Sequence, residues 1–262
     1  MAVARSRQVT IKSPAEIERM RRAGRVVAEV LALVESELKP GVSTADLDRL
    51  AERHIRASGA VPSFKGYPGA NPRRPFPGSI CISIDDEIVH GIPGERTIRD
   101  GMVVSIDAGA IVEGWHGDGA RTFFIGADIP DRTRRLIDTT RLAMMAGIAA
   151  AVPGGHIEDI GIAVEAIADT EGLGVIRHYV GHGIGREMHE EPQVPNYRTG
   201  WAGRRLEPGL CLAIEPMFTL GTYETHMLPD DWTVVTDDGS LAAHFEHTIA
   251  ITERGPEVLT TV

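Results

Sequence analysis

Apolar side chains recur every three or four residues in four stretches of the chain, a pattern that predicts four amphipathic helices. The first helix is expected to begin after Ser13, because a capping serine there is followed by proline and glutamate in the first turn. Pro-Gly pairs or single glycines mark where the helices should end. The four predicted helices lie within residues 13–40, 43–59, 130–152 and 157–171.

Shorter apolar runs lie between and after these helices and are typical of β-strands. Residues 66–79 are rich in proline and glycine, so this segment should form a loop. Helices in pairs, followed by antiparallel strands, predict the α+β class. The predicted strands cover residues 80–84, 102–108, 121–125, 175–179, 210–214, 233–236 and 245–251.

The two parts of the chain repeat the same landmarks in the same order, which suggests a duplicated half-domain. We expect a single domain over residues 13–262, with halves of roughly 13–128 and 129–262 and an N-terminal tail over 1–12. Matching acidic residues should then lie near a pseudo-two-fold axis. The matched landmarks are Pro40-Gly41 with Pro153-Gly154, Asp46 with Asp159, Gly59 with Gly172, His90-Gly91-Ile92 with His182-Gly183-Ile184, Asp107 with Glu215, and His116-Gly117-Asp118 with His244-Phe245-Glu246.

Composition narrows the possible environment and partners. The 262 residues carry a formal net charge of −10, which argues against general nucleic-acid binding. We expect no membrane span and no secretory signal, because no apolar run is long enough and residues 1–12 lack an apolar core. Two cysteines, Cys81 and Cys211, exclude a disulfide scaffold and fit a reducing, cytoplasmic location.

Four acids and one histidine stand at unusual places in this pattern. Asp107 and Glu215 each end an apolar strand, and Glu246 lies within an alternating strand. Taken singly, each has an ordinary explanation: an acid facing water, a plain turn for the glycine-flanked Asp118, and a structural role for His182. Together they suit a dinuclear site, because two divalent cations balance four carboxylates and make their burial possible. Such a site can activate water against an amide.

Motifs for other hydrolytic or nucleotide-binding chemistry are absent from the sequence. There is no H-E-x-x-H, P-loop, G-x-S-x-G, or strand followed by G-x-G-x-x-G. The motifs that are present closely resemble those of type I methionine aminopeptidases of the bacterial short form, from about Ile11 onward. They are Val89–Pro93, Ser105–Gly109, His116–Asp118, Gly181–Arg186, Met188–Pro192, Ile214–Met217, Asp231–Thr233 and Phe245–Thr248.

The resemblance implies the pita-bread fold of creatinases and aminopeptidases, with two pseudo-symmetric halves around a central metal site. It implies two divalent metal ions per chain, which could be Fe, Mn, Co or Zn, with Asp118 and Glu246 bridging both. His90 and His189 would contact the substrate and the tetrahedral intermediate, and Glu215 would also accept a proton from the attacking water. The implied metal ligands are Asp107, Asp118, His182, Glu215 and Glu246.

The family's pocket for the methionine side chain maps onto aromatic and sulfur-containing residues. The less favoured alternative, for Phe64 and Met188, is that they belong to the ordinary core. The implied activity is removal of the initiator methionine from nascent chains, when the second residue is small, by a cytoplasmic monomer at or near the ribosome. No nucleic acid or membrane is expected to bind directly. The implied pocket residues are Phe64, Tyr67, Phe76, Cys81, Met188 and Trp232.

Two features depart from the family's pattern, and two other functions stay open. The loop Pro68–Pro75 is longer than usual, and Met188 stands where a bulkier aromatic often occurs. An Xaa-Pro aminopeptidase or dipeptidase shares the fold and the five ligands but usually carries an additional N-terminal domain. A non-catalytic binding relative would be expected to have lost ligands, whereas all five are present here.

Overall fold

Four helices form where the sequence predicts them. The computed structural model describes residues 6–262, so residues 1–5 of the predicted tail lie outside the described residues. At the start of the first helix the Ser13 backbone N–H donates to Glu16 Oε2 at 2.8 Å, closing a capping box. The fourth helix ends at Gly172, which has the left-handed conformation at φ 63°. The helices are α1 (Pro14–Glu37), α2 (Thr44–Ala57), α3 (Asp131–Ala150) and α4 (Ile157–Glu171).

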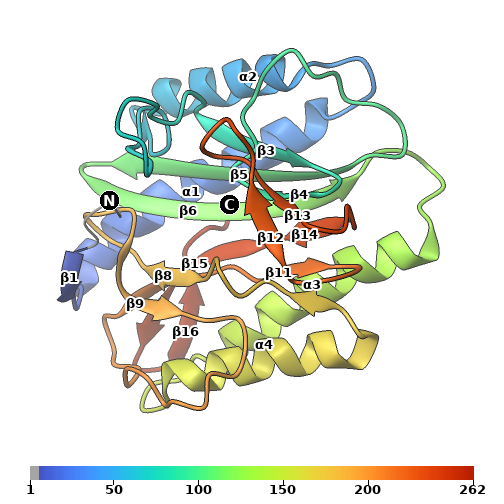
Figure 1. Ribbon diagram of the computed structural model, residues 1–262. Coiled ribbons are helices and arrows are strands. Elements are labelled where there is room, and N and C mark those ends of the chain that lie inside the picture. The colour runs from blue at the N-terminus through green and yellow to red at the C-terminus, as the bar shows by residue number, and fades with distance from the viewer. Residues whose placement is uncertain (1–5) are drawn as a thin grey trace.

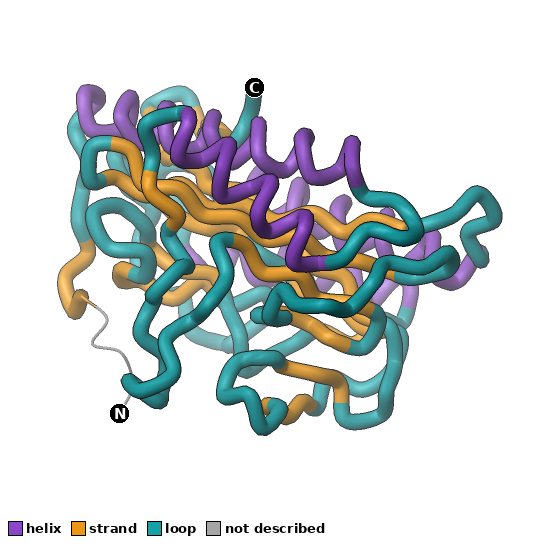
Figure 2. Tube along the Cα trace, turned by 90° about the horizontal axis from the view of Figure 1, so that it is seen from above, coloured by secondary structure: helices purple, strands orange, loops and turns teal. Residues whose placement is uncertain are grey.

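A ten-stranded sheet forms the centre of the molecule, and the helices lie on one side of it (Figures 1 and 2). All of its pairings are antiparallel except that of β1 with β9. In spatial order its main path is β1 (Ser6–Val9), β9 (Glu190–Val194), β8 (Gly181–Gly183), β10 (Cys211–Ile214), β15 (Glu246–Thr252), β6 (Trp115–Phe124), β5 (Val103–Val112) and β2 (Val61–Pro62), with β16 (Gly255–Val258) beside β15 and β3 (Ile80–Ile84) beside β5.

Two small antiparallel sheets complete the fold, and the predicted α+β class is confirmed. Within residues 6–262 the structure contains no helix with the length and apolarity needed to span a bilayer. The small sheets are β14 (Ala242–His244), β11 (Met217–Thr219) and β7 (Gly174–Val175), and β12 (Thr225–Met227), β13 (Val234–Thr236) and β4 (Glu87–Val89).

Each pair of helices packs against its own part of the large sheet. One apolar core joins α1 and α2 to β3 and β5, and a second joins α3 and α4 to β10 and β15. The two parts meet where β15 pairs with β6, with Glu246 opposite Ala120. Acids on these two strands therefore lie at the centre of the sheet. The division of the chain near residue 128 stays a prediction.

Strand β6 begins at Trp115, six residues before the predicted start, so Asp118 lies in a strand and not in a turn. The glycines on both sides of Asp118 are not typical of a strand, so the sequence pattern did not predict one there. Gly117 is required by packing, because a Cβ there would lie 2.6 Å from the backbone nitrogen of Gly24 on α1. The predicted strand over 175–179 is also shorter, since only Gly174–Val175 pair.

Candidate metal centre

The structure brings the candidate metal ligands, His90, His189 and the candidate pocket residues into one cavity of about 130 Å³. The acids and histidines form its polar side, and the aromatic and sulfur-containing residues form its apolar side. The cavity is lined by Phe64, Tyr67, Phe76, Cys81, His90, Asp107, Asp118, His182, Met188, His189, Glu215, Trp232 and Glu246.

Neighbouring strands of the central sheet carry the five candidate metal ligands. Asp107 lies on β5, Asp118 on β6 and Glu246 on β15, while His182 lies on β8 and Glu215 directly follows β10. His182 Nε2 lies 3.5 Å from Glu215 Oε1 and 4.0 Å from Asp118 Oδ2. The antiparallel register thus places side chains from five separate segments around one point.

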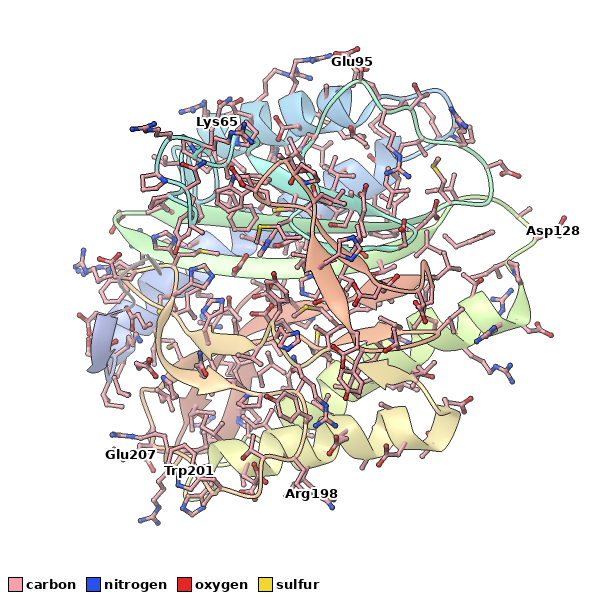
Figure 3. The ribbon with its side chains drawn as sticks, viewed as in Figure 1. Lys65, Glu95, Asp128, Arg198, Trp201 and Glu207 are labelled. Atoms are coloured by element: carbon pink, nitrogen blue, oxygen red, sulfur yellow. The ribbon has the colours of Figure 1, made fainter. Side chains whose placement is uncertain are left out.

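Two of these carboxylates are buried, unlike the acids that cover the surface. Glu95, Asp128 and Glu207 point outward at the periphery (Figure 3), whereas Asp118 and Glu246 are only 4% and 2% exposed. Burial raises the pKa of Asp118 well above its usual value, and the nearby Glu246 carboxylate raises it further. An acid cluster in this state is costly to charge unless cations balance it.

Burial has the same effect on the other two strand acids. It raises the pKa of Asp107 to about 7, and it raises the pKa of Glu246 well above its usual value, with Glu215 adding to the shift. Among the residues described, Asp107 Oδ1 and Glu246 Oε1 are buried without a hydrogen-bond partner. Buried carboxylate oxygens without a hydrogen-bond partner are donors that a divalent ion would satisfy.

The donor set fits divalent metal ions. Ligand atoms of Asp118, His182 and Glu246 all lie within 4.8 Å of one another. His182 Nδ1 lies 2.9 Å from the carbonyl oxygen of Gly183, so this nitrogen donates the proton and Nε2 keeps its lone pair toward the acids. Carboxylate oxygens with one imidazole suit Mn, Fe, Co or Zn better than a sulfur-preferring metal.

Two more histidines lie beside this cluster without belonging to the five candidate ligands. The ring of His189 lies 4.4 Å from that of His182, and the hydroxyl of Tyr67 lies 2.6 Å from His189 Nδ1. His90 has a left-handed backbone at φ 61°, an uncommon conformation for a residue other than glycine. Burial lowers the pKa of His90 to about 4, so its imidazole is neutral at ordinary pH.

The apolar side of the cavity is built from aromatic edges and sulfur. Phe76 packs edge-on against Phe64, with centroids 6.4 Å apart, and against Trp232 at 5.1 Å. Cys81 and Met188 are both buried beside them. Phe64 and Met188 therefore form a small cluster with the other pocket residues, in addition to being buried.

Three residues near the site were not predicted from the sequence. His244 is buried, with its Nε2 3.7 Å from Glu215 Oε2 and without a hydrogen-bond partner among the described residues. The sequence signal that could have indicated His244 is its match with His116 in the repeated landmarks. Tyr179 packs edge-on against His90 at 5.7 Å. Thr248 Oγ1 donates to the Asp118 carbonyl at 2.8 Å and so fixes the backbone of that residue.

The chain matches the model of metallopeptidase family M24 over residues 18–253. It is similar to a methionine aminopeptidase of Clostridium acetobutylicum, at 50% identity over 96% of this chain and 98% of that protein. It is also 47% identical to methionine aminopeptidase 1 of Bacillus subtilis, over 97% of this chain and 100% of that protein.

Solved structures of methionine aminopeptidases share the fold. That from Thermotoga maritima superposes with a TM-score of 0.92 at 39% identity, over 97% of this chain and all of that one. Prolidase from Pyrococcus furiosus gives a TM-score of 0.77 at 23% identity, over 96% of this chain but only 65% of that one. The second likeness shows the fold alone, and both agree with the predicted pita-bread arrangement.

Proposed function

We propose that this chain, which belongs to metallopeptidase family M24, is a methionine aminopeptidase that removes the N-terminal methionine of nascent proteins with two divalent metal ions. One observation supports this most directly: a buried cluster of acids and a histidine shares a cavity with an apolar pocket of aromatic rings and sulfur. The first part is suited to hydrolysis of an amide, and the second to an unbranched thioether side chain.

The metal ions would be held by Asp107, Asp118, His182, Glu215 and Glu246. Two divalent ions would balance the four carboxylates and satisfy the unpartnered oxygens of Asp107 and Glu246. When bound, they would supply Lewis-acid activation of a water and of the scissile carbonyl. Fe, Mn, Co and Zn all accept this donor set.

Protein groups would carry the proton and orient the substrate. Glu215 lines the cavity next to His182 and is positioned to accept a proton from the attacking water. The neutral imidazole of His90 can donate a hydrogen bond to the developing negative charge of the intermediate. His189, held by the Tyr67 hydroxyl, also lines the cavity and would do the same.

The apolar part of the cavity would select the first residue of the substrate. A methionine side chain would lie among the rings of Phe64, Phe76 and Trp232, where contacts between sulfur and aromatic rings contribute about 0.3–1.5 kcal/mol each. The second residue would have to pass His90 and His189, so a small side chain is favoured there.

An Xaa-Pro peptidase is the nearest alternative, and it is less supported. Relatives of 43–50% identity are methionine aminopeptidases, whereas the prolidase likeness is one of fold. A non-catalytic binding protein would not need five candidate ligands and two additional histidines in one cavity. Both alternatives predict that a peptide beginning with Met-Ala is not the preferred substrate.

We also infer that the enzyme acts as a monomer in the cytoplasm, on nascent chains at or near the ribosome, without binding nucleic acid directly or a membrane. Both cysteines are free and form no disulfide, which supports a reducing compartment. The net charge of −10 supports a protein rather than a nucleic-acid partner.

The test compares cleavage of a Met-Ala-Ser peptide with that of an Xaa-Pro peptide, each with and without added divalent metal. We expect metal-dependent release of free methionine from the first peptide and little cleavage of the second. Preferred cleavage of the Xaa-Pro peptide would establish the alternative enzyme. Cleavage of neither, with metal bound, would favour the binding protein.

A further inference from the structure

Trp232 lies in the wall of the cavity, and the loop 68–75 contacts it. The base of this loop is closed by two backbone hydrogen bonds, from Phe76 to Tyr67 at 2.9 Å and from Gly66 to Phe76 at 2.8 Å. The loop therefore leaves and returns to the chain at two pocket residues. Any change in its position would be transmitted to the pocket.

Four polar contacts bind this loop to the segment 229–232, and one of them is an ion pair between Arg74 and Asp231 at 3.3 Å. The indole Nε1 of Trp232 donates to the carbonyl oxygen of Arg74 at 2.9 Å. The Asn71 side chain donates to Asp231 Oδ2 at 3.0 Å, and the Arg74 guanidinium donates to the carbonyl oxygen of Pro229 at 3.1 Å. The indole N–H is fixed by the loop backbone, which leaves the rest of the ring to be positioned by packing.

Gly69 provides that packing surface. A Cβ at residue 69 would lie 2.7 Å from Trp232 Cζ2 and 3.0 Å from Cη2, so the loop backbone lies directly against the six-membered ring. Other contacts of the indole are with Phe76 at 5.1 Å and with His90 at 6.2 Å between centroids. The ring thus contacts the loop as well as two residues of the cavity.

We propose that the loop 68–75 is a clamp that fixes Trp232 and thereby sets the length of first side chain that the pocket accepts. This proposal rests on the proposed function, because it concerns selection within the same cavity. Gly69 is the specificity-determining position: the absence of a side chain lets the ring stand back from the cavity. A methyl group at Gly69 would push the ring toward Phe76 and His90 and shorten the pocket.

Gly69→Ala tests the clamp, and Gly94→Ala is its matched control. Both glycines are half-buried in loops, and neither has a positive φ, so alanine introduces no backbone strain at either. A Cβ at residue 94 would meet nothing within 4 Å. The two variants therefore differ in whether the added methyl group meets Trp232.

Two measurements are needed on each metal-loaded variant. One is kcat/KM for peptides that begin with methionine and with norvaline, whose side chain is shorter. The other is the ¹⁹F spectrum of protein labelled with 5-fluorotryptophan, in which the Trp232 signal is assigned by its loss in Trp232→Phe. This spectrum reports the position of the ring without reference to activity.

For Gly69→Ala we expect a shifted Trp232 signal and a fall of about tenfold in the preference for methionine over norvaline. Asn71→Ala should broaden the same signal and lower the preference by a smaller factor, whereas Arg73→Ala in the same loop should change neither. Gly94→Ala should match the wild type in both measurements.

An unmoved Trp232 signal with wild-type preference in Gly69→Ala would overturn the clamp, as would an equal loss in Gly94→Ala. If Gly69→Ala fails to fold, Asn71→Ala is compared with Arg73→Ala. An unmoved Trp232 signal and wild-type preference in Asn71→Ala, or an equal loss in Arg73→Ala, would then overturn the clamp. The wild-type protein separates this result from the proposed function. If the wild type does not cleave the methionine peptide, the proposed function fails, while the ¹⁹F spectra still decide whether the loop positions Trp232.

Discussion

Lys12 and Glu190 form a salt bridge 2.8 Å long although both side chains are only 2% exposed. The Glu190 carboxylate also accepts hydrogen bonds from Thr10 Oγ1 and from the backbone N–H of Arg186 at 2.9 Å. This pair joins the segment before α1 to the first residue of β9, directly after His189. The N-terminal segment therefore supports one wall of the candidate site.

Lys12→Met should lower the free energy of unfolding by about 3–5 kcal/mol, because it leaves the Glu190 carboxylate buried without its cation. Denaturant unfolding of the metal-loaded protein measures this. Lys39→Met is the control, since its partner Glu37 is exposed and such pairs contribute about 1 kcal/mol or less. Equal effects of the two substitutions would show that the buried pair contributes no more to the free energy of unfolding than the exposed pair.

Metal binding should become tighter as pH rises from about 5 to 7.5. Burial raises the pKa of Asp107 to about 7, so in metal-free protein this carboxyl holds a proton below that pH and must release it to bind an ion. Its raised pKa also means that folded metal-free protein binds more protons than the unfolded chain between about pH 4 and 7, and loses stability as pH rises through this range.

Chelation should therefore lower Tm more at pH 7.5 than at pH 5. Metal titration followed by calorimetry should give two ions per chain, together with proton release that can be measured in buffers of different ionisation enthalpy. A single weakly bound ion at saturation would contradict the dinuclear site. A metal affinity that does not depend on pH would contradict the raised pKa of Asp107.

Glu215→Gln should lower kcat by about 10²–10⁴-fold, with a much smaller change in substrate binding. The amide keeps the shape of the side chain but cannot accept the proton of the attacking water. Metal content must be measured in the same preparation, since Glu215 is also a candidate ligand. Near-normal turnover at full metal occupancy would show that another group accepts the proton.

His90→Ala and His189→Ala should each lower kcat by about 10²–10³-fold while metal content stays unchanged. Both rings line the cavity, but neither belongs to the five candidate ligands. Elemental analysis beside steady-state kinetics separates the two roles. Loss of one ion in either variant would place that histidine among the ligands.

The helices could be predicted because their signals are local. Ser13 and Glu16 cap α1 within one turn, and apolar spacing continues through the helix. The short strands β8, β9 and β11 were not predicted. The first is Gly-His-Gly, the second contains Pro192, and the third has only three residues, so their conformation depends on pairing with neighbours.

The residues of the candidate site were found by repeat and resemblance, but their contacts were not. Lys12 and Glu190 lie 178 positions apart, so no spacing in the sequence connects them. The contact of Gly69 with Trp232 could not be predicted for the same reason, since it depends on how a loop folds back onto a distant segment. Such contacts follow from the sheet register, which local patterns do not fix.

Selectivity for methionine followed by a small residue follows from the two parts of the cavity. At the first position, a charged side chain would be buried among Phe64, Phe76 and Trp232 without a partner, at a cost of several kcal/mol. A β-branched side chain would overpack the same rings, at about 1–3 kcal/mol. We therefore expect kcat/KM to be highest for methionine in a peptide series that varies only the first residue.

The second position should be limited by bulk and not by polarity, because that residue must pass the rings of His90 and His189. Peptides of the form Met-Xaa-Ser should be cleaved fastest when Xaa is Gly, Ala or Ser, and more slowly as its volume grows. A charged but small residue such as aspartate distinguishes the two causes, since it should be slowed less than leucine if bulk decides. Faster cleavage of peptides that begin with leucine, or that carry proline at the second position, than of Met-Ala-Ser would refute this assignment of the pocket.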